Sequence, residues 1–234
     1  TGGHKGEYWH RWIERRPVQL LVGATIAILI GGLVEIFPMV TIEDNVPKIE
    51  SVKPYTALEL EGRDLYIREG CLSCHSQMVR PFRSETERYG EYSKSGEFIY
   101  DRPFLWGSKR TGPDLHRLGG KYPDSWHFNH MYDPTSTSPG SIMPPYPWLI
   151  EDEIDYGLTV AKLKTLKTLG TPYTDEYIEN AVAEAQAQAE QVAASLKRDG
   201  IEMEGLEKRE IVALIAYLQR LGTDIKPKAQ ADAE

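Results

Sequence analysis

The chain is poor in cysteine and histidine: of its 234 residues, two are cysteine and six are histidine. Both cysteines lie in one run, Cys71-Leu72-Ser73-Cys74-His75. A structural zinc site would need two further cysteine or histidine ligands at matching spacing, and no second cysteine pair exists. A disulfide between cysteines three residues apart would contribute little stability, because the loop that it closes is very short.

The Cys-x-x-Cys-His spacing of this run is the attachment signature of a c-type haem. The two thiols add to the vinyl groups of the porphyrin, and the adjacent histidine is held under the iron as a ligand. A thioredoxin-like redox pair is an alternative, but such pairs belong in a βαβ context, and the flanks here have helical patterns. The run therefore predicts one covalently bound haem c, attached through Cys71 and Cys74 and ligated by His75.

Charged residues are absent from Val18 to Val34, which reads VQLLVGATIAILIGGLV. Extended to Pro38, the stretch has about 20 residues, which at about 1.5 Å per residue spans the ~30 Å hydrocarbon layer. A cleaved signal peptide would have a shorter apolar core and a small-residue cleavage site, and neither fits here. We predict a retained membrane helix, with Pro17 in its first turn and Pro38 at its end.

The same apolar segment contains no histidine, so it cannot ligate a haem b or a copper ion within the bilayer. Acidic residues follow it, whereas four basic residues precede it, Lys5, Arg11, Arg15 and Arg16. The positive-inside rule then places the amino end in the cytoplasm and the remainder outside, in the periplasm of a bacterium. A net charge of −8 argues against nucleic acid as a partner.

Outside the membrane segment the patterns are helical, and strands are not required anywhere. Helices are predicted over 56–68, 174–197 and 207–221, the last with Gly222 just beyond its end. Residues 76–150 are rich in proline, glycine and aromatics, and so long an irregular stretch is usually functional or wrapped around something. The predicted organisation is a cytoplasmic segment (1–17), a transmembrane anchor (18–38), a linker (39–54), an all-α haem domain (55–225) and a flexible tail (226–234).

The second iron ligand has several candidates. Met143 lies in a loop stiffened by two following prolines, which would fix its thioether at a lower entropy cost. His127 and His130 are the main rivals and would give a bis-histidine haem. The full set of candidates is Met78, Met131, Met143, Met203, His116, His127 and His130.

The run Gly112-Pro113-Asp114-Leu115 could also serve the haem. In a haem protein the Pro113 carbonyl could accept the ring N–H of His75 and so fix its tautomer. The alternative is an ordinary turn, since Gly-Pro and Pro-Asp are turn formers.

Several long strings resemble the mono-haem cytochrome c subunit of cbb3-type cytochrome c oxidases. They are the membrane anchor, then GRDLYIREGCLSCHSQMVRPFRSETERYGEYS, then DRPFLWGSKRTGPDLHRLGGKYPDSW, then MPPYPWL. The resemblance implies a class I cytochrome c domain with long irregular loops around one haem, carried on one membrane helix. It also implies His75 and Met143 as the axial ligands, and a helix before the haem motif that crosses the last helix. We infer that Gly62 is the point of close contact with the Tyr217 face. The segment 160–205 carries no motif of the family.

This resemblance implies an electron-transfer subunit that is not an enzyme on its own. It would sit in the bacterial inner membrane and receive electrons from an upstream cytochrome c through a multihaem cytochrome c subunit. It would pass them to haem b of the catalytic haem-copper subunit. The alternatives are the small cytochrome c subunit of nitric-oxide reductase, a membrane-anchored haem gas sensor, and a purely structural assembly subunit.

Three polar residues receive roles from the resemblance or from their chemistry. The loop 106–110 resembles a stretch that faces the catalytic subunit, and Ser108 would contribute there to a calcium site near the haem propionates. Arg80 and Arg110 are candidates for pairing with the propionates or with the partner subunit, although solvated surface arginines are the more common case.

Overall fold

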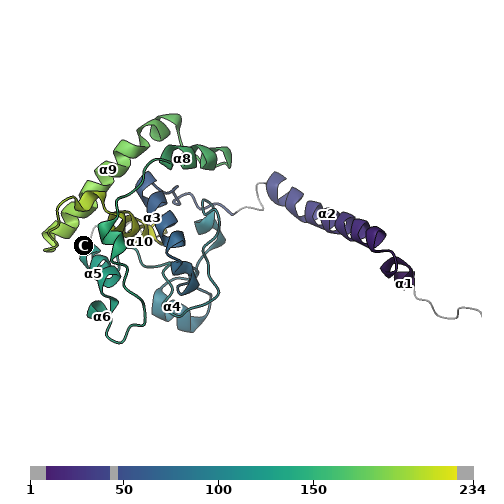
Figure 1. Cartoon of the computed structure of the whole chain (residues 1–234), viewed down its shortest axis with the longest axis horizontal. Coiled ribbons are helices and arrows are strands. Elements are labelled where there is room, and N and C mark those ends of the chain that lie inside the picture. Colours follow the sequence, from purple (N-terminus) through teal and green to yellow (C-terminus); the bar gives the residue numbers. More distant parts are fainter. Residues whose placement is uncertain (1–8, 43–46, 226–234) are drawn as a thin grey trace, which may run out of the picture. The chain divides into compact units, whose positions relative to one another are not determined.

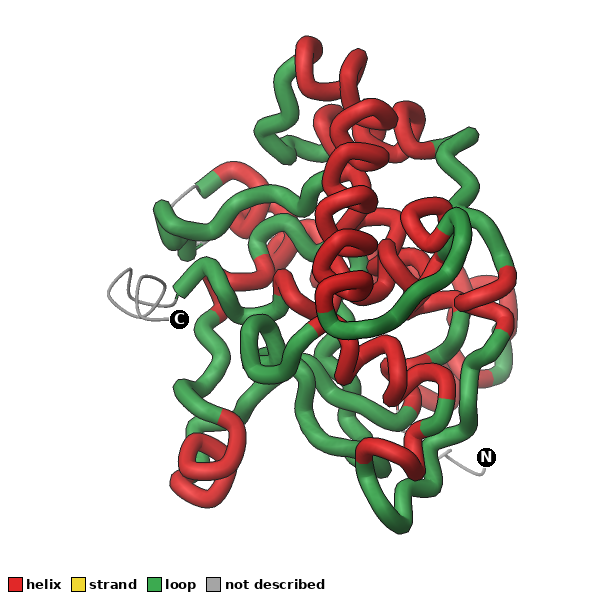
Figure 2. Tube along the Cα trace, turned by 90° about the vertical axis from the view of Figure 1, so that its left-hand side faces the viewer, coloured by secondary structure: helices red, strands yellow, loops and turns green. Residues whose placement is uncertain are grey.

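The computed structural model describes residues 9–42 and 47–225. Within these ranges the regular structure is helical, and the only β-pairing is an isolated bridge between Glu153 and Arg209. Long loops join the helices (Figure 2). The all-α fold predicted from the sequence is confirmed. Residues 1–8 of the predicted cytoplasmic segment and the predicted tail over 226–234 lie outside the described ranges.

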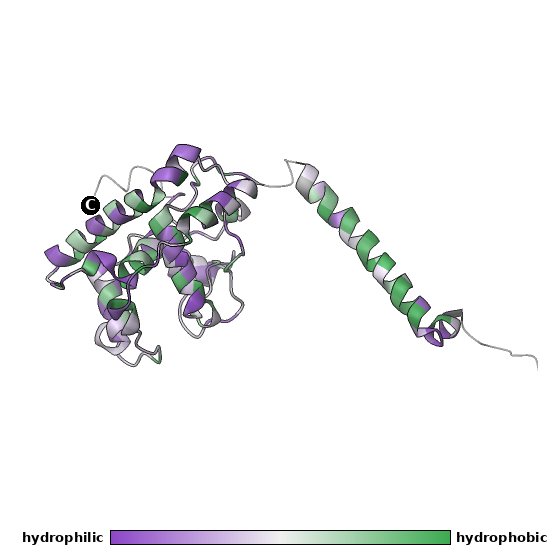
Figure 3. Ribbon diagram, turned by 45° about the horizontal axis from the view of Figure 1, so that its top comes forward, coloured by the Kyte–Doolittle hydropathy of each residue, from purple (hydrophilic) through white to green (hydrophobic). Residues whose placement is uncertain are grey.

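The first of two compact units, Thr1–Pro47, contains α1 (Trp9–Glu14) and α2 (Pro17–Thr41). The stretch Pro17–Met39 has a mean hydropathy of 2.4, none of it is buried within the structure, and it is long enough to cross a membrane. Hydrophobic colouring dominates this helix along its length (Figure 3). The single membrane helix predicted from the sequence is therefore present.

The predicted end of this helix at Pro38 is wrong. The helix continues to Thr41, and the Ile42 amide donates to the Pro38 carbonyl oxygen at 2.9 Å. Proline lacks the N–H that would bond to the preceding turn, but its carbonyl still accepts from the following turn. A proline so close to the end of a helix therefore removes one bond without stopping the helix.

The second unit, Lys48–Glu234, is built on the crossing of α3 (Ala57–Arg68) with α10 (Glu210–Arg220) at its centre (Figure 1). Thr56 and Glu59 form a capping box that starts α3. Gly62 lies against α10 so closely that a Cβ there would sit 1.9 Å from the Ala213 carbonyl oxygen and 2.8 Å from Tyr217 Cβ. The predicted close contact between Gly62 and the Tyr217 face is confirmed.

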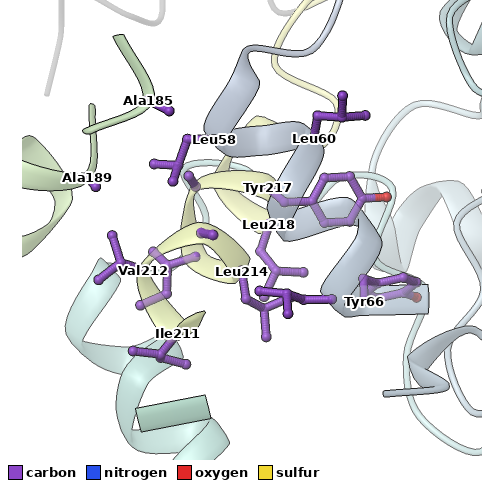
Figure 4. Close-up of a cluster of buried hydrophobic side chains, with 14 of the residues drawn as sticks. Leu58, Leu60, Tyr66, Ala185, Ala189, Ile211, Val212, Leu214, Tyr217 and Leu218 are labelled. Carbon is purple, nitrogen blue, oxygen red and sulfur yellow. The ribbon is translucent and has the colours of Figure 1, made fainter. Parts of the chain in front are cut away.

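The core of this unit forms where α3 and α10 face each other and α9 (Asp175–Arg198) covers them. Small residues of α9, Ala185 and Ala189, let it approach closely. Tyr217 packs against two other tyrosines in tilted ring contacts, with ring centroids 5.6 Å from Tyr66 and 5.7 Å from Tyr55. Figure 4 shows the side chains that meet there, which include Leu58, Leu60, Tyr66, Ile211, Val212, Leu214, Tyr217 and Leu218.

Three elements after residue 150 differ from or extend the prediction. The expected helix over 207–221 is a 3₁₀ turn, η4 (Leu206–Lys208), followed by α10 from Glu210. The sequence patterns did not predict α8 (Thr159–Thr168), whose buried residues are only Thr159 and Leu163. Besides the packing of Leu163 in the core, α8 is tied to α3 by Lys162, which pairs with Glu61 at 2.6 Å and Asp64 at 2.7 Å.

The stretch 76–150 has the short helices and long loops expected from its composition. The 3₁₀ turn η2 (Cys71–Ser73) leads into it from the end of α3. Its own elements are α4 (Arg83–Tyr89), η3 (Ser95–Phe98), α5 (Asp124–Tyr132), α6 (Pro134–Thr137) and α7 (Trp148–Glu151).

Candidate haem site

The cysteine-histidine run begins where α3 ends. Gly70 adopts a left-handed conformation (φ 71°), which reverses the chain and starts η2. The amide of His75 donates to the Cys71 carbonyl oxygen at 2.9 Å, closing one turn. This turn brings Cys71, Cys74 and His75 together on the wall of one cavity.

The two cysteines form no disulfide in the structure. Burial raises the pKa of the Cys71 thiol to about 12, and the neighbouring Glu69 carboxylate adds to the rise. A catalytic redox cysteine needs a lowered pKa, because the thiolate is the nucleophile. Cys71 therefore lacks the lowered pKa that a reactive redox thiolate requires.

The cavity has a volume of about 590 Å³ and is lined mostly by apolar and aromatic side chains. This volume lies within the ~300–1,000 Å³ typical of cofactor pockets. The core helices supply Tyr66, Leu214 and Leu218, and the loop after α6 supplies Met143. A flat, largely apolar macrocycle with polar groups at one edge fits such a lining.

The His75 side of the cavity is closely built. Its Nδ1 lies 2.8 Å from the Pro113 carbonyl oxygen, the contact expected from the Gly-Pro-Asp-Leu run. When Nδ1 donates to this carbonyl, Nε2 is left as the nitrogen free to bind a metal. A Cβ on Gly112 would lie 2.3 Å from Cε1 of the imidazole, so only glycine allows this approach.

Four of the seven candidates for the second iron ligand line the cavity: Met131, Met143, His127 and His130. The other three lie elsewhere. Met203 is 41% exposed beside the turn after α9. His116 lines a separate small cavity and contacts Ser93 Oγ through Nδ1, at 2.5 Å. Met78 follows the motif directly, with its amide bonded to Asp114.

The two cavity histidines differ in their surroundings. His130 is stacked on Trp126 and its Nδ1 contacts Thr137 Oγ1 at 2.6 Å. Burial, and then the charge of His75, lower its pKa, and both residues line the same cavity. His127 is 1% exposed, burial lowers its pKa to about 4, and its buried Nε2 has no protein partner among the described residues.

Arg80 and Arg110 do not reach the cavity wall; both bind Glu85. Their guanidinium groups are thus engaged by a protein carboxylate. The cations that line the cavity are instead Arg88, Arg117 and Lys121, and sequence reasoning missed them. Charged residues are common in this stretch, and only the fold distinguishes the three that face inward.

The loop that carries Ser108 packs directly against the haem motif. The Gln77 amide donates to the Trp106 carbonyl oxygen at 2.8 Å, and Gly107 lies close to the His75 carbonyl. Ser108 itself is exposed. In the described part of the chain, no three histidine, cysteine or acidic residues gather into a group that could hold a metal ion.

Comparison with known proteins agrees with this geometry. Residues 10–225 match the family model described as cytochrome c oxidase, mono-haem subunit/FixO. A search of curated proteins finds no match to the chain. The match covers α1, α2, the haem motif, every cavity wall and α10. The chain therefore belongs to the FixO family of mono-haem subunits of cytochrome c oxidase.

Proposed function

We propose that the chain is an electron relay that carries one haem c between His75 and Met143, attached covalently through Cys71 and Cys74. The observation that carries the proposal is the 2.8 Å contact of His75 with the Pro113 carbonyl, on the wall of a cavity that also contains both cysteines and Met143. Once bound, haem supplies reversible one-electron chemistry at its iron. Everything else in the site holds, orients or shields it.

Each side chain then has a physical task. The Pro113 carbonyl fixes the His75 ring and makes the imidazole a better donor. Met143 supplies a thioether, and histidine-methionine ligation favours a high reduction potential. Tyr66, Leu214 and other apolar side chains exclude water from the space between them.

The proposed location is the bacterial inner membrane. Residues 18–38 would cross the bilayer once, with residues 1–17 in the cytoplasm, residues 39–54 as linker and residues 55–225 as the periplasmic haem domain. The positive-inside rule supports this orientation, and the α2 segment Pro17–Met39 supplies the span. Membrane lipid is thus one partner.

The other partners are proposed to be the subunits of the oxidase. The chain would accept electrons from an upstream cytochrome c through a multihaem cytochrome c subunit and pass them to haem b in the catalytic haem-copper subunit. Phe104 and Trp106 support a docking face beside the haem motif, because they are stacked (4.4 Å between centroids) and remain 55% and 37% exposed. Ser108, in the same loop, would add one oxygen to a calcium site completed by the catalytic subunit.

The test is purification of the membrane complex that contains this chain, followed by haem counting. One haem should stay on this chain after denaturation, b-type haems should lie on a larger subunit, and the complex should consume oxygen. Replacing Cys71 and Cys74 together by alanine should remove the covalent haem and abolish oxygen consumption by the assembled complex. Nitric-oxide reduction without oxygen consumption, or full turnover without the covalent haem, would overturn the proposal.

A further inference from the structure

Asp114 is a buried carboxylate next to the residue whose carbonyl contacts His75. Its side chain is 0% exposed. Oδ2 accepts hydrogen bonds from Ser76 Oγ at 2.6 Å and from the Met78 amide at 2.8 Å, and Oδ1 accepts from the His116 amide at 2.9 Å. One side chain therefore ties its own turn to the residues that directly follow His75.

Arg110 closes this arrangement from the outside. Its Nε donates to Ser76 Oγ at 2.6 Å, and Nη2 donates to the Met78 carbonyl oxygen and to Glu85, each at 2.8 Å. Asp114 Oδ2 is 3.4 Å from the same Nη2. Ser76 Oγ thus donates to the carboxylate and accepts from the guanidinium, so every polar group here has a partner. A buried network that is fully satisfied in this way rigidifies its surroundings.

Two backbone bonds run parallel to the network. The Gly112 amide donates to the Cys74 carbonyl oxygen, and the Leu115 amide donates to the Ser76 carbonyl oxygen, both at 2.9 Å. These bonds hold the ends of the turn, on either side of Pro113. Proline has no N–H and can form no such bond, so the side chain of Asp114 is the nearest anchor to the carbonyl that contacts His75.

We propose that Asp114 is a positioning residue that holds the Pro113 carbonyl against His75 and thereby helps to set the reduction potential of the site. The inference rests on the proposed role of His75 as an iron ligand and adds a residue to it. A carbonyl held in place keeps the imidazole strongly donating, which favours the oxidised iron. The buried negative charge of Asp114 favours the oxidised state as well, because that state carries one more positive charge.

The test uses the full-length haem-loaded chain in detergent, with two readouts: the midpoint potential and the solvent exchange of the His75 ring N–H, followed by NMR. Asp114→Asn should shift the equilibrium towards the reduced state by about tenfold, which raises the midpoint potential by 59 mV for one electron. It should also accelerate exchange of the His75 ring N–H. Ser76→Ala removes one donor to Asp114 without a change of charge. It should produce smaller changes of the same sign.

Glu97→Gln is the matched control for loss of a buried negative charge. The Glu97 side chain is 4% exposed, binds Arg117 at 2.6 Å and the Lys94 amide at 2.8 Å, and lies 3.4 Å from His116 Nε2, but among the described residues it forms no hydrogen bond with 74–78 or 112–115. Its neutralisation should leave the ring N–H exchange at the wild-type rate. Equal exchange rates in wild type, Asp114→Asn and Ser76→Ala would overturn the positioning role. His75→Ala separates this failure from failure of the proposed function: an unchanged haem spectrum there would remove His75 as the ligand.

Discussion

The wall of the cavity that carries His75 and the wall that carries Met143 are held with different strength. Around His75, backbone bonds and the Asp114 side chain tie two distant segments together. Around Met143, the Met143 amide donates to Ser141 Oγ at 3.2 Å and the Ser141 amide to the Ser138 carbonyl oxygen, both within the same loop. Ile142, next to the ligand candidate, is 80% exposed.

This difference assigns different tasks to the two proposed ligands. The His75 ring is oriented by its hydrogen bond to the Pro113 carbonyl and by its close packing against Gly112. A methionine on a loosely bonded loop can adjust to the position of the iron. The restraint on that loop comes from two prolines after Met143 and from the bond between the Tyr146 amide and the Met131 carbonyl oxygen, at 2.8 Å.

The largest effect is expected from Gly112→Ala, which should sharply reduce the fraction of chain that carries haem. Its Cβ would lie 2.3 Å from the His75 ring, so the ring or the turn must shift. Gly140→Ala is the control on the opposite wall: no heavy atom lies within 4 Å, and only its φ of +81° is unfavourable, at about 1–2 kcal/mol. Covalent haem per chain, measured after denaturation, checks both variants. Equal losses of covalent haem in the two variants would show that the two walls are equally sensitive to an added methyl group.

The next effect is a change of coordination in Met143→Ala. Removal of the thioether should leave a five-coordinate iron, so the reduced protein should bind carbon monoxide, which the wild type should bind little. Met131→Ala is the control, since Met131 lines the same cavity but is 8% exposed within the core. It should cost about 2–5 kcal/mol of stability and leave the coordination unchanged. Carbon monoxide binding to the reduced Met131→Ala variant, but not to Met143→Ala, would instead place the ligand on α5.

A smaller effect is expected on the pH dependence of stability, through Glu85 in the Arg110 network beside His75. Hydrogen bonds from Arg110, and then from Arg80, lower the pKa of Glu85 from its usual 4.5 to about 2. A lowered pKa in the folded state contributes stability that is complete above pH ~4.5 and is lost as the pH falls towards 2. The unfolding temperature of the full chain should therefore fall less steeply over this range in Glu85→Gln than in the wild type.

Glu87→Gln is the control for this pH dependence, because Glu87 lies on the same helix but is 62% exposed and pairs only with the exposed Arg83. An exposed pair of this kind contributes little to stability. Its variant should therefore follow the wild-type slope. A slope unchanged by Glu85→Gln would show that the Arg110 network does not stabilise the fold.

The features that could be predicted from the sequence are those that depend on residues close together in the chain. The apolar run of α2, the stripe of α9, and the spacing of Cys71, Cys74 and His75 are local features, and Gly62 was found because close helix crossings need glycine. The elements that the sequence did not reveal depend on distant partners. Helix α8 has a thin apolar face and relies on Lys162, whose acidic partners lie about a hundred residues earlier.

The polar residues of the site show the same limit. Arg80 follows the haem motif closely in sequence and Arg110 lies in the 106–110 loop, yet the fold directs both towards Glu85. From the sequence, Asp114 was interpreted only as part of a turn. Its bonds to Ser76 and Met78 could not be predicted, because they join segments 36 to 38 residues apart. Sequence spacing alone carries no information about which charged side chains turn inward.

The most direct test of the two-wall account is hydrogen exchange of the full-length, haem-loaded chain in detergent, measured peptide by peptide. Within 74–78 and 110–116, the amides of Gln77, Met78, Gly112 and Leu115 are bonded to a segment distant in sequence, and these should exchange slowly. Amides in 138–143 should exchange much faster under the same conditions. Equal protection of the two segments, or faster exchange around His75, would contradict the account.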